Sequence, residues 1–306
     1  MRFSIWPSSR ETADTFVELA RHGERTGWDG FWVADHFMPH DGDLDQPTLE
    51  CSALISALSL SVPRLRFGAL VAGNTYRHPA VFAKTMVTAD QLSGGRVVLG
   101  LGAGWQENEH LAYGLEFPAL KGRIERFEEA CALIKQLIAN ERTDFKGKYY
   151  TLVDAPFAPK PAGPLPLLIG AAGEKVTMRI AARYADEWNC WGDPELFAHK
   201  TRVLDRHCEE LGRDPGEIKR STQVVVLLRD SPAELRQLEE SDEWPRRISG
   251  NTDQIIEQLC AYAQAGLDEF ILPVAGFGEG EERKDRLEAF IQAARSVPEL
   301  SPQSAN

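Results

Sequence analysis

The amino-acid sequence predicts a closed (β/α)8 barrel. Short apolar runs alternate with amphipathic segments eight times along the 306-residue chain, a rhythm typical of parallel strands joined by helices. Eight such units within about 250 to 300 residues favour a closed barrel over an open doubly wound sheet, which stays the alternative fold. No shift in composition suggests a linker, so we expect residues 1–306 to form one domain.

The first half of the predicted barrel contains four units. Its short apolar runs are typical of buried strands, and its longer segments repeat apolar residues with the helical period. Gly27 and Pro63 follow the first two helices, and Pro79 stands near the start of the third, where proline is tolerated. Strands are expected at residues 2–6, 30–36, 65–74 and 96–105, and helices at residues 9–27, 48–61, 79–93 and 123–139.

An irregular insertion separates the fourth unit from the fifth. Residues 140–164 contain a predicted hairpin that turns at Gly147, followed by a proline-rich connection. The alternation then resumes, apart from a polar stretch at residues 231–250 without a predicted element, and we expect residues 301–306 to fray. Strands are expected at residues 165–173, 186–191, 221–230 and 268–276, and helices at residues 174–185, 193–212, 251–266 and 281–297.

The composition argues against several classes of protein. A formal net charge of −12 and a pI of about 5.2 disfavour a protein that binds nucleic acid or an anionic membrane, because both need a clustered basic face. The five cysteines form no CxxC pair, so neither a disulfide framework nor a zinc site is expected. We find no signal peptide and no apolar stretch of about 20 residues, which predicts a cytoplasmic protein.

The predicted strands end in residues that carry chemistry. In a barrel of parallel strands the carboxyl ends meet at one rim, where the active sites of such barrels lie. Trp6-Pro7, Asp35-His36 and Gly73-Asn74 end the first three strands, and the stretches GAGWQENEH, GAAGEK and WNCWGD end the next three. Polar, aromatic and glycine residues therefore converge on one rim, which we expect to be the functional site.

The Asp35-His36 pair allows three interpretations. A metal site would use His36 together with His40, but Pro39 lies between them and no helix aligns the two rings, so the geometry argues against it. A histidine at a strand end is often bonded to a backbone carbonyl and has only a structural role. The third interpretation is a catalytic acid or base, and the sequence pattern by itself leaves the last two open.

Several motifs resemble the bacterial luciferase-like family. They are DGFWVADHF, GNTYRHPAVFAK, TADQLSGGRVVLGLGAGWQENEHLAYG, GKYYTL and ARYADEWN. The resemblance extends from residue 2 to about residue 298, is most specific at residues 88–114, and is strongest to the branch of coenzyme F420-dependent oxidoreductases. It implies a (β/α)8 barrel and hydride chemistry on a flavin or 5-deazaflavin whose ring lies across the barrel mouth.

The resemblance implies a role for His36. The matching histidine in relatives lies beside the reactive edge of the cofactor ring, where His36 would donate a proton or polarise a substrate oxygen. Asp35 would either orient that histidine or accept backbone N–H groups. Asn108 and Glu109 match polar positions that line the pocket, while Glu107, Glu109 and His110 by themselves form only a weak acid–base pattern.

The third strand is expected to be irregular near its end. Gly68 and Gly73 within one strand indicate a bulge or a close backbone approach, although an ordinary strand exit is the alternative. In relatives this strand carries a bulge that supports the ring from behind. We therefore expect a bulge at residues 71–73, with Asn74 touching the ring.

The stretch GLGAGW is not expected to bind a dinucleotide, because no suitable helix is predicted to begin there and no acidic ribose partner follows. Gly102 and Gly104 instead would let the chain pass close under a flat ring. Family members that oxidise sugar phosphates carry a glutamate where this chain has Trp105. That departure indicates a more apolar substrate, with packing of the rim as the alternative role for Trp105.

The stretch IGAAGEKVTMR predicts an anion site. A helix expected to begin near Glu174 would present free N–H groups and the positive end of its dipole to a cofactor phosphate at Gly173 and Glu174, with charge added by Lys175 and Arg179. A plain strand-to-helix turn is the alternative. Relatives usually have glycines where this chain has Ala171 and Ala172, so the backbone of this loop has fewer allowed conformations here than in those relatives.

Aromatic residues surround the sixth strand. Trp188 and Trp191 either pack in the core or wall the ribityl chain of the cofactor. The residues expected to contact the cofactor are Trp6, His36, Val71, Ala72, Gly73, Asn74, Gly104, Asn108, Gly170, Ala171, Gly173, Glu174, Lys175 and Trp191. The expected catalytic residues are Asp35, His36, Asn108 and Glu109, and no metal ligand is expected.

Three functions follow from the residues and the resemblance. The first is an F420-dependent oxidoreductase that moves a hydride between the deazaflavin and a small organic substrate. The second is an FMN-dependent monooxygenase on the same scaffold, and the motifs do not separate the two because the cofactor supplies the chemistry. The third is a barrel that binds flavin without turnover. The resemblance also implies a homodimer formed through barrel helices.

Overall fold

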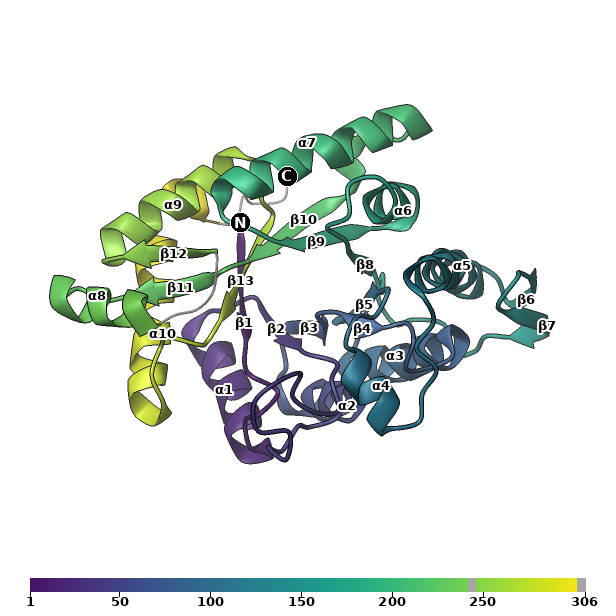
Figure 1. The fold of residues 1–306 in the computed structure, drawn as a ribbon, viewed down its shortest axis with the longest axis horizontal. Helices are drawn as coiled ribbons and strands as arrows, with labels where there is room; N and C mark the ends of the chain where they lie inside the picture. The colour runs from purple at the N-terminus through teal and green to yellow at the C-terminus, as the bar shows by residue number, and fades with distance from the viewer. Residues whose placement is uncertain (242–245, 302–306) are drawn as a thin grey trace.

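A closed barrel of eight parallel strands forms the centre of the computed structural model, which describes residues 1–241 and 246–301 (Figure 1). Each strand is hydrogen-bonded to its neighbours in the ring, and the pairing of β3 with β5 closes it. The predicted closed barrel is therefore confirmed, and the alternative open sheet is not formed. The strands are β1 (Arg2–Trp6), β2 (Gly30–Val33), β3 (Arg66–Ala69), β5 (Val97–Gly102), β8 (Leu167–Gly170), β9 (Glu187–Trp191), β10 (Lys219–Gln223) and β13 (Glu269–Pro273).

Helices cover the outside of this ring (Figure 1). Their ends carry ordinary capping residues: Thr12 accepts from the Thr15 N–H at the start of α1, and Gly27 ends that helix with a φ of 89°. The large helices are α1 (Ala13–Thr26), α2 (Cys51–Ser61), α3 (Pro79–Ser93), α5 (Leu120–Ala139), α6 (Thr177–Tyr184), α7 (Pro194–Leu211), α9 (Thr252–Gln264) and α10 (Gly280–Ser296). Within the described residues, no helix is long and apolar enough to cross a membrane.

Two apolar cores result from the alternation of side chains along the strands. The larger core lies between the outer faces of the strands and the helices. A small second core fills the inside of the barrel, where Trp32, Val98 and Ile271 meet Leu70 and Leu168. The barrel interior is therefore packed in its middle, and a ligand has room only at an end.

The third predicted strand, residues 65–74, is interrupted. β3 ends at Ala69 and β4 (Ala72–Gly73) pairs with β5 only after a break at Leu70 and Val71, which are joined by a cis peptide bond. The irregular backbone expected at residues 71–73 is therefore present. The Val71 side chain lies over Gly102 and Gly170, because a Cβ built on either glycine would fall 2.8 or 2.7 Å from a Val71 methyl group.

The insertion between units four and five contains the predicted hairpin. Strands β6 (Arg142–Lys146) and β7 (Thr151–Pro156) pair antiparallel and project at one edge of the molecule, and the Gly147 N–H donates to the Tyr150 carbonyl across the turn (Figure 1). Two short 3-10 helices, Pro215–Glu217 and Pro298–Leu300, complete the connections. The prediction for the tail falls mostly on residues 302–306, which lie outside the described residues.

Four sequence predictions of secondary structure were wrong. The strand expected at residues 221–230 divides at Val224, because β10 stays in the barrel while β11 (Val225–Leu228) pairs with β12 (Arg247–Gly250) in a separate small sheet. The polar stretch after it contains α8 (Pro232–Ser241) as well as β12. The helix expected from Glu174 begins only at Thr177, and an unpredicted short helix, α4 (Glu107–Ala112), follows β5.

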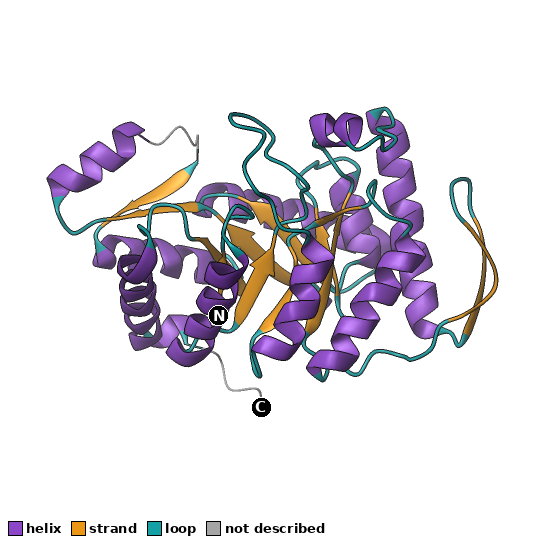
Figure 2. Cartoon of the chain, turned by 90° about the horizontal axis from the view of Figure 1, so that it is seen from below, coloured by secondary structure: helices purple, strands orange, loops and turns teal. Residues whose placement is uncertain are grey.

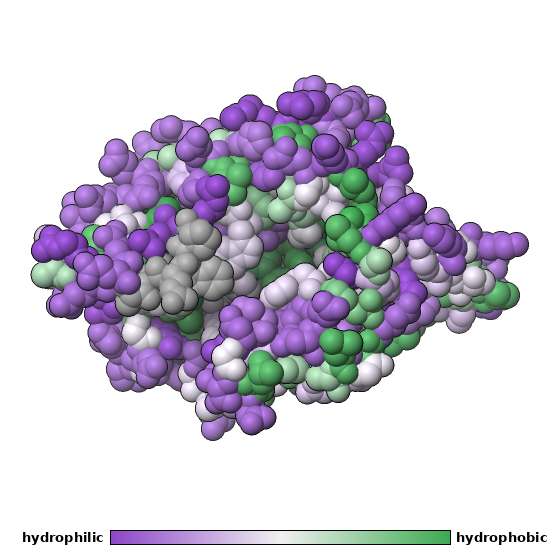
Figure 3. All heavy atoms as spheres, in the orientation of Figure 1, coloured by the Kyte–Doolittle hydropathy of each residue, from purple (hydrophilic) through white to green (hydrophobic). Residues whose placement is uncertain are grey.

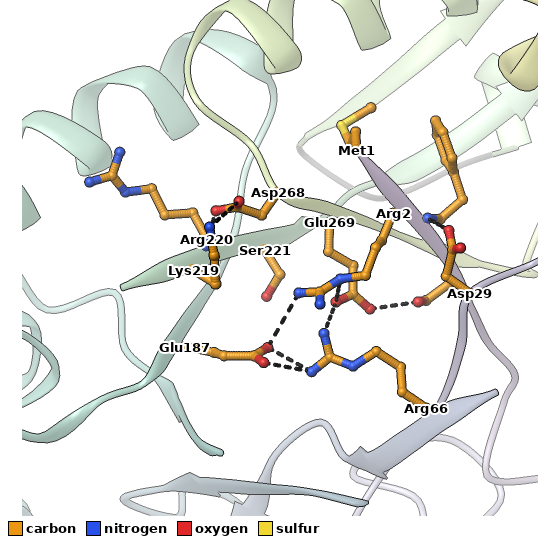
Figure 4. Close-up of polar contacts among 12 residues, drawn as sticks. Met1, Arg2, Asp29, Arg66, Glu187, Lys219, Arg220, Ser221, Asp268 and Glu269 are labelled. Atoms are coloured by element: carbon orange, nitrogen blue, oxygen red, sulfur yellow. Dashed lines mark hydrogen bonds and ion pairs between the residues drawn. The ribbon is translucent and has the colours of Figure 1, made fainter. Parts of the chain in front are cut away.

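The amino end of the barrel is closed by a buried ionic cluster of Arg2, Arg66, Glu187 and Glu269, which we call the floor cluster (Figure 4). Both nitrogens at the end of Arg66 are used: Nη1 donates to Glu269 at 2.7 Å, and Nη2 donates to the two oxygens of Glu187 at 2.8 and 2.7 Å. Arg2 lies 3.2 Å from Glu269. Ion pairs therefore connect four strands from both halves of the barrel, namely β1, β3, β9 and β13.

Glu269 is the most enclosed member of the floor cluster. Its other oxygen accepts from the Ser4 hydroxyl at 2.5 Å and from the Trp32 indole at 2.9 Å. Burial by itself raises the pKa of Glu269, but the charges of Arg66 and Arg2 and these two hydrogen bonds hold that pKa below its ordinary value. The carboxylate consequently stays ionised inside the barrel.

We predict that Arg66→Met lowers the free energy of unfolding by about 3–5 kcal/mol at pH 7, because it leaves two buried carboxylates short of positive charge. Urea denaturation measures this change. Arg142→Met is the matched control, since Arg142 pairs with Asp154 on the surface and its loss should cost less than about 1 kcal/mol.

The pH dependence of this loss checks its cause. The folded-state pKa of Glu269 is lowered, so its stabilising contribution is present above the ordinary pKa of about 4.5 and is lost as the pH falls through the folded value. The difference between wild type and Arg66→Met should therefore shrink below pH 4.5. An equal difference at pH 7 and at pH 3 would show that lost packing, not charge, causes the effect.

Candidate active site

The carboxyl end of the barrel holds the candidate site. In Figure 2 the amino end of β1 lies at the lower edge, and the longest loops rise at the opposite edge, which faces the reader in Figures 1 and 3. Figure 3 shows a hollow in the middle of that face, with pale and apolar residues at its floor. The strand ends predicted to converge therefore surround a hollow.

His36 and Glu109 form the central pair of this site. His36 follows β2, Glu109 lies on α4, and the His36 Nδ1 atom is 2.9 Å from Glu109 Oε1. The Glu109 side chain is fully buried, while the His36 side chain keeps a quarter of its surface exposed. The structure thus joins two predicted catalytic residues that are 73 positions apart in the chain.

Three donors converge on the Glu109 carboxylate. Besides His36, the Phe37 N–H donates to Oε2 at 2.8 Å and the Tyr76 hydroxyl donates to Oε1. Burial raises the pKa of Glu109, but these hydrogen bonds and the nearby imidazole lower it below the ordinary value. Burial and the bond to Glu109 raise the pKa of Tyr76, so the phenol stays protonated and remains a donor.

The ionised Glu109 fixes the tautomer of His36. A carboxylate with no proton can only accept, so Nδ1 carries the proton of the neutral ring and Nε2 carries the lone pair. Among the described residues, no group forms a hydrogen bond with Nε2, and the ring is partly open to the hollow. This arrangement can take a proton from a substrate hydroxyl or return it.

α4 connects two rim loops through its polar side chains. His110 is 2.6 Å from the Gln106 carbonyl through Nδ1 and 2.7 Å from the Thr75 hydroxyl through Nε2. On the other side, Asn108 Nδ2 donates to the carbonyls of Pro39 and His40 at 3.1 and 3.2 Å. Asn108 thus holds the loop after β2, and His110 does not join an acid–base set with Glu109.

The short helix corrects the sequence analysis of GLGAGW. A helix does begin after this stretch, although it has only six residues and starts at Glu107. Gly104 has a φ of 79°, and a Cβ there would lie 2.3 Å from Thr75 Oγ1, so a side chain would displace the hydroxyl that bonds His110. The glycine is needed for the anchoring of α4.

Asp35 is turned away from His36. It accepts the Gly73 N–H at 3.0 Å and two hydrogen bonds from Arg77 at 2.8 and 2.9 Å, and Arg77 also binds Glu50. Of the two roles left open for Asp35, the contacts favour the acceptor of a backbone N–H. The residue that orients His36 is Glu109 and not Asp35.

The residues predicted to contact the ring follow strand ends at the carboxyl side of the barrel. Trp6 and Trp191, at the ends of β1 and β9, have ring centroids 5.5 Å apart. Asn74 is buried and its amide donates to the Tyr150 hydroxyl at 3.1 Å, while Trp188 packs in the core and donates to the Ala171 carbonyl. For Trp188 the contacts therefore favour the core interpretation.

The loop after β8, where an anion site is predicted, lacks the helix start that was expected there. The Gly173 N–H donates to the Thr177 hydroxyl at 3.0 Å, and the Glu174 carboxylate accepts from His199 and from Lys200 at 2.9 and 2.8 Å. Lys175 is exposed beside them. Residues 174–176 form a turn, and the helix therefore begins three residues later than expected.

The residues of the hollow fit a flat ring with polar edges. Gly102 and Gly170 lack side chains next to Val71, which leaves an apolar shelf at the top of the barrel. Among the residues predicted to contact the cofactor, two carry a buried polar atom without a hydrogen-bond partner: Trp6 at Nε1 and Asn74 at Oδ1. Such unpartnered groups are costly unless a ligand or water completes them.

Tyr76 is the residue that sequence analysis missed. It lies two positions after Asn74, within one of the motifs that carry the family resemblance, and a tyrosine hydroxyl at a strand end is a signal for a site. Its partner could not be inferred, because Glu109 is 33 residues away. In residues 1–241 and 246–301, no three His, Cys, Asp or Glu side chains gather as a metal site.

A (β/α)8 barrel with a histidine–carboxylate pair at its carboxyl end is the architecture of a barrel enzyme. The chain belongs to the luciferase-like monooxygenase family, whose profile matches residues 1–246. It is therefore an enzyme and an oxidoreductase, and not the non-catalytic barrel considered as a third function.

The chain is similar to named members of this family. It is 30% identical over 304 residues to an F420-dependent glucose-6-phosphate dehydrogenase of Amycolatopsis mediterranei (strain U-32), covering 87% of this chain and 90% of the relative. It is 29% identical to F420-dependent glucose-6-phosphate dehydrogenase 1 of Rhodococcus jostii (strain RHA1), covering 90% and 91%. The structure of an F420-dependent secondary alcohol dehydrogenase in complex with an F420-acetone adduct superposes with a TM-score of 0.82 at 20% identity, over 95% and 98% of the two chains.

We predict that Tyr76→Phe destabilises the protein by about 1–3 kcal/mol, because it removes a donor from a buried carboxylate. It should also loosen His36, which shares that oxygen of Glu109. Chemical denaturation measures the first effect, and the NMR signal of the His36 Nδ1 proton, which should exchange faster with water, measures the second.

Tyr113→Phe is the matched control. Its hydroxyl donates to the Phe37 carbonyl at 3.4 Å on an exposed side chain, so both effects should be small. If the two variants behave alike, the Tyr76 hydroxyl does not support the His36–Glu109 pair.

Proposed function

We propose that the protein is an F420-dependent oxidoreductase that moves a hydride between the deazaflavin and a small organic substrate. The observation that carries this proposal is the pairing of His36 with a buried, ionised Glu109 at the mouth of the barrel. The relatives from Amycolatopsis and Rhodococcus, whose names state F420 dependence, support the choice of cofactor.

His36 is the proton-transfer residue in this proposal. In this proposal its Nε2 carries the lone pair, and it takes the hydroxyl proton when an alcohol is oxidised, or gives a proton to oxygen when a carbonyl is reduced. Glu109 holds the ring in one tautomer and its negative charge stabilises the imidazolium. F420, when bound, supplies the site that accepts or gives the hydride.

Residues of five strand ends would hold the cofactor. Val71, Ala72 and Gly73 would support the ring, Asn74 and Trp6 carry the unpartnered polar atoms, and Gly104 with Asn108 shape the adjacent loop. Trp191 would lie beside the chain that links ring and phosphate. Gly170, Ala171, Gly173, Glu174 and Lys175 form the loop that we propose for the phosphate.

An FMN-dependent monooxygenase is the second candidate, favoured by the description of the family as luciferase-like monooxygenases. The residues around the hollow suit both ring systems, so a binding titration with F420, FMN and FAD separates them. An oxygen-consumption assay follows, because only the monooxygenase uses dioxygen. Tight binding of F420 without oxygen uptake supports the first candidate, and FMN binding with oxygen uptake supports the second.

We predict that His36→Ala lowers turnover by about 10²-fold or more while the protein stays folded, because it removes the proton-transfer group. His40→Ala should have a much smaller effect, since His40 lies on the rim loop and pairs with Asp41 at the surface. Steady-state kinetics with matched circular dichroism spectra make the comparison.

Metal chelators should not change the activity of the wild type or of either histidine variant. Loss of activity on chelation, restored by zinc or manganese, would argue for a metal enzyme. Equal damage from the two histidine substitutions would leave His36 without a distinct role and contradict the proposal.

We predict that Gly173→Val weakens binding of F420 or FMN by about tenfold or more, because a β-branched side chain crowds the turn next to the phosphate. A Cβ added to Gly173 would lie 2.9 Å from the Thr177 hydroxyl oxygen. Fluorescence titration measures the dissociation constant, and Gly122→Val, within α5, is a control for the effect of a valine on folding. An unchanged constant would move the phosphate to another loop, for example the one after Asp230.

A further inference from the structure

The structure points to the class of substrate: we propose an uncharged alcohol or carbonyl compound whose apolar part lies against Trp105. This inference rests on the proposed function, since it concerns the molecule that exchanges a proton with His36. It makes Trp105 a residue that determines specificity, and it predicts that sugar phosphates, the substrates named for similar proteins, are poor substrates of this enzyme.

Trp105 occupies an unusual position for a tryptophan. It stands between Gly104 and the start of α4, and 60% of its surface is exposed. Its neighbours touch it by their edges, with ring centroids 5.4 Å away for His36 and 5.7 Å away for His40. The indole is therefore held at the rim by few contacts, and packing of the rim does not account for it.

An exposed indole beside an acid–base residue is suited to an apolar ligand. Covering its face removes apolar surface from water, which is favourable in proportion to the area covered, and an aromatic or alicyclic ring has the shape to do so. Two further large apolar side chains are exposed in this segment, Leu111 on α4 and Tyr113 directly after it. Apolar groups gathered at a site are typical of recognition of an apolar molecule.

The position of Trp105 matches the chemistry of His36. The rings of His36 and Trp105 meet nearly edge to face, at 77°, so they bound one corner of the rim. A hydroxyl or carbonyl oxygen that reaches His36 Nε2 brings its own carbon skeleton to that corner. Proton transfer and apolar contact are thus available to one small molecule at once.

The charges around the site disfavour a phosphate dianion. Glu109 is ionised and buried next to His36, where it repels an anion. Three cations at the carboxyl end of the barrel are already engaged: Arg77 by Asp35 and Glu50, Lys200 by Glu174, and Arg246 by Asp193. The exposed Lys175 lies in the loop that we propose for the cofactor phosphate. A sugar phosphate would have to break one of these pairs or compete with the cofactor for Lys175, whereas an uncharged substrate does neither.

The reaction balances with groups that the proposal already names. An alcohol gives its hydroxyl proton to His36 Nε2 and its carbinol hydride, which carries two electrons, to oxidised F420. The C–H and O–H bonds break, the C=O bond forms, and the product leaves as an aldehyde or ketone. The reverse direction reduces the carbonyl compound with the same proton and hydride.

Kinetics with F420 as oxidant test the substrate class. Wild type should oxidise cyclohexanol or benzyl alcohol with a kcat/KM at least about tenfold above that for glucose 6-phosphate. Trp105→Ala should lower kcat/KM for the two apolar alcohols by about tenfold, mainly through KM, and Trp105→Phe should retain most of it because an aromatic face remains. Leu60→Ala, which removes an equally exposed apolar side chain from α2, should change nothing.

A measurement without cofactor tests the contact itself. In the 1H–15N NMR spectrum of the cofactor-free protein, the indole signal that disappears in Trp105→Phe belongs to Trp105. Titration with cyclohexanol should shift this signal, and titration with glucose 6-phosphate should leave it in place.

The outcomes separate this inference from the proposed function. Preference for glucose 6-phosphate, or equal kinetics of wild type and Trp105→Ala, would overturn the inference while the F420-dependent function stands. Failure of wild type to bind F420 would overturn the proposed function, and the NMR titration would still decide the role of Trp105. A Trp105 signal that responds to glucose 6-phosphate and not to cyclohexanol would overturn the inference by itself.

Discussion

The barrel depends on the contacts of one buried carboxylate, that of Glu269. It is completely buried, and its two oxygens bind Arg66, Arg2, Ser4 and Trp32, so one side chain of β13 connects to β1, β2 and β3. A buried charge of this kind is tolerated only when every partner is in place. Because Arg66 also binds Glu187 on β9, the floor cluster joins strands from both halves of the chain and favours the one register in which the ring closes.

The same physical principle recurs at the opposite end of the barrel with a different result. Glu109 is another fully buried carboxylate whose donors come from distant segments, but one of these donors is His36, which is partly exposed. At the floor, both carboxylates and Arg66 are buried, Arg2 is partly exposed, and the cluster contributes to stability. At the mouth, the His36 partner of the carboxylate is partly exposed, and the buried network fixes the orientation of the side chain that we propose for proton transfer.

The mouth therefore combines a rigid part with an open part. α4 is tied to the loops after β2 and β4 through Asn108 and His110, which holds Glu109 in place. Trp105 immediately precedes this helix and has few contacts of its own. A fixed acid–base pair suits one type of chemistry on many substrates, and an exposed residue next to it can select among them. This division explains how similar chains can share a cofactor chemistry and differ in the molecule that they oxidise.

The sequence by itself determined the barrel, because each apolar strand and each amphipathic helix can be recognised from residues close together in the chain. Eight such units in alternation then indicate a (β/α)8 barrel. The sequence also placed His36 at the rim, since a residue at a strand end has only one end of the barrel to occupy. It did not determine the break of the seventh strand at Val224, because the valines at positions 224–226 form one continuous apolar run and only the pairing of β11 with β12 separates the two parts. Nor could it give α4, whose residues are mostly polar, or the choice of Glu109 over Asp35 as the partner of His36. Those features depend on contacts between residues tens of positions apart, which have no period along the chain, and only the tertiary structure decided them.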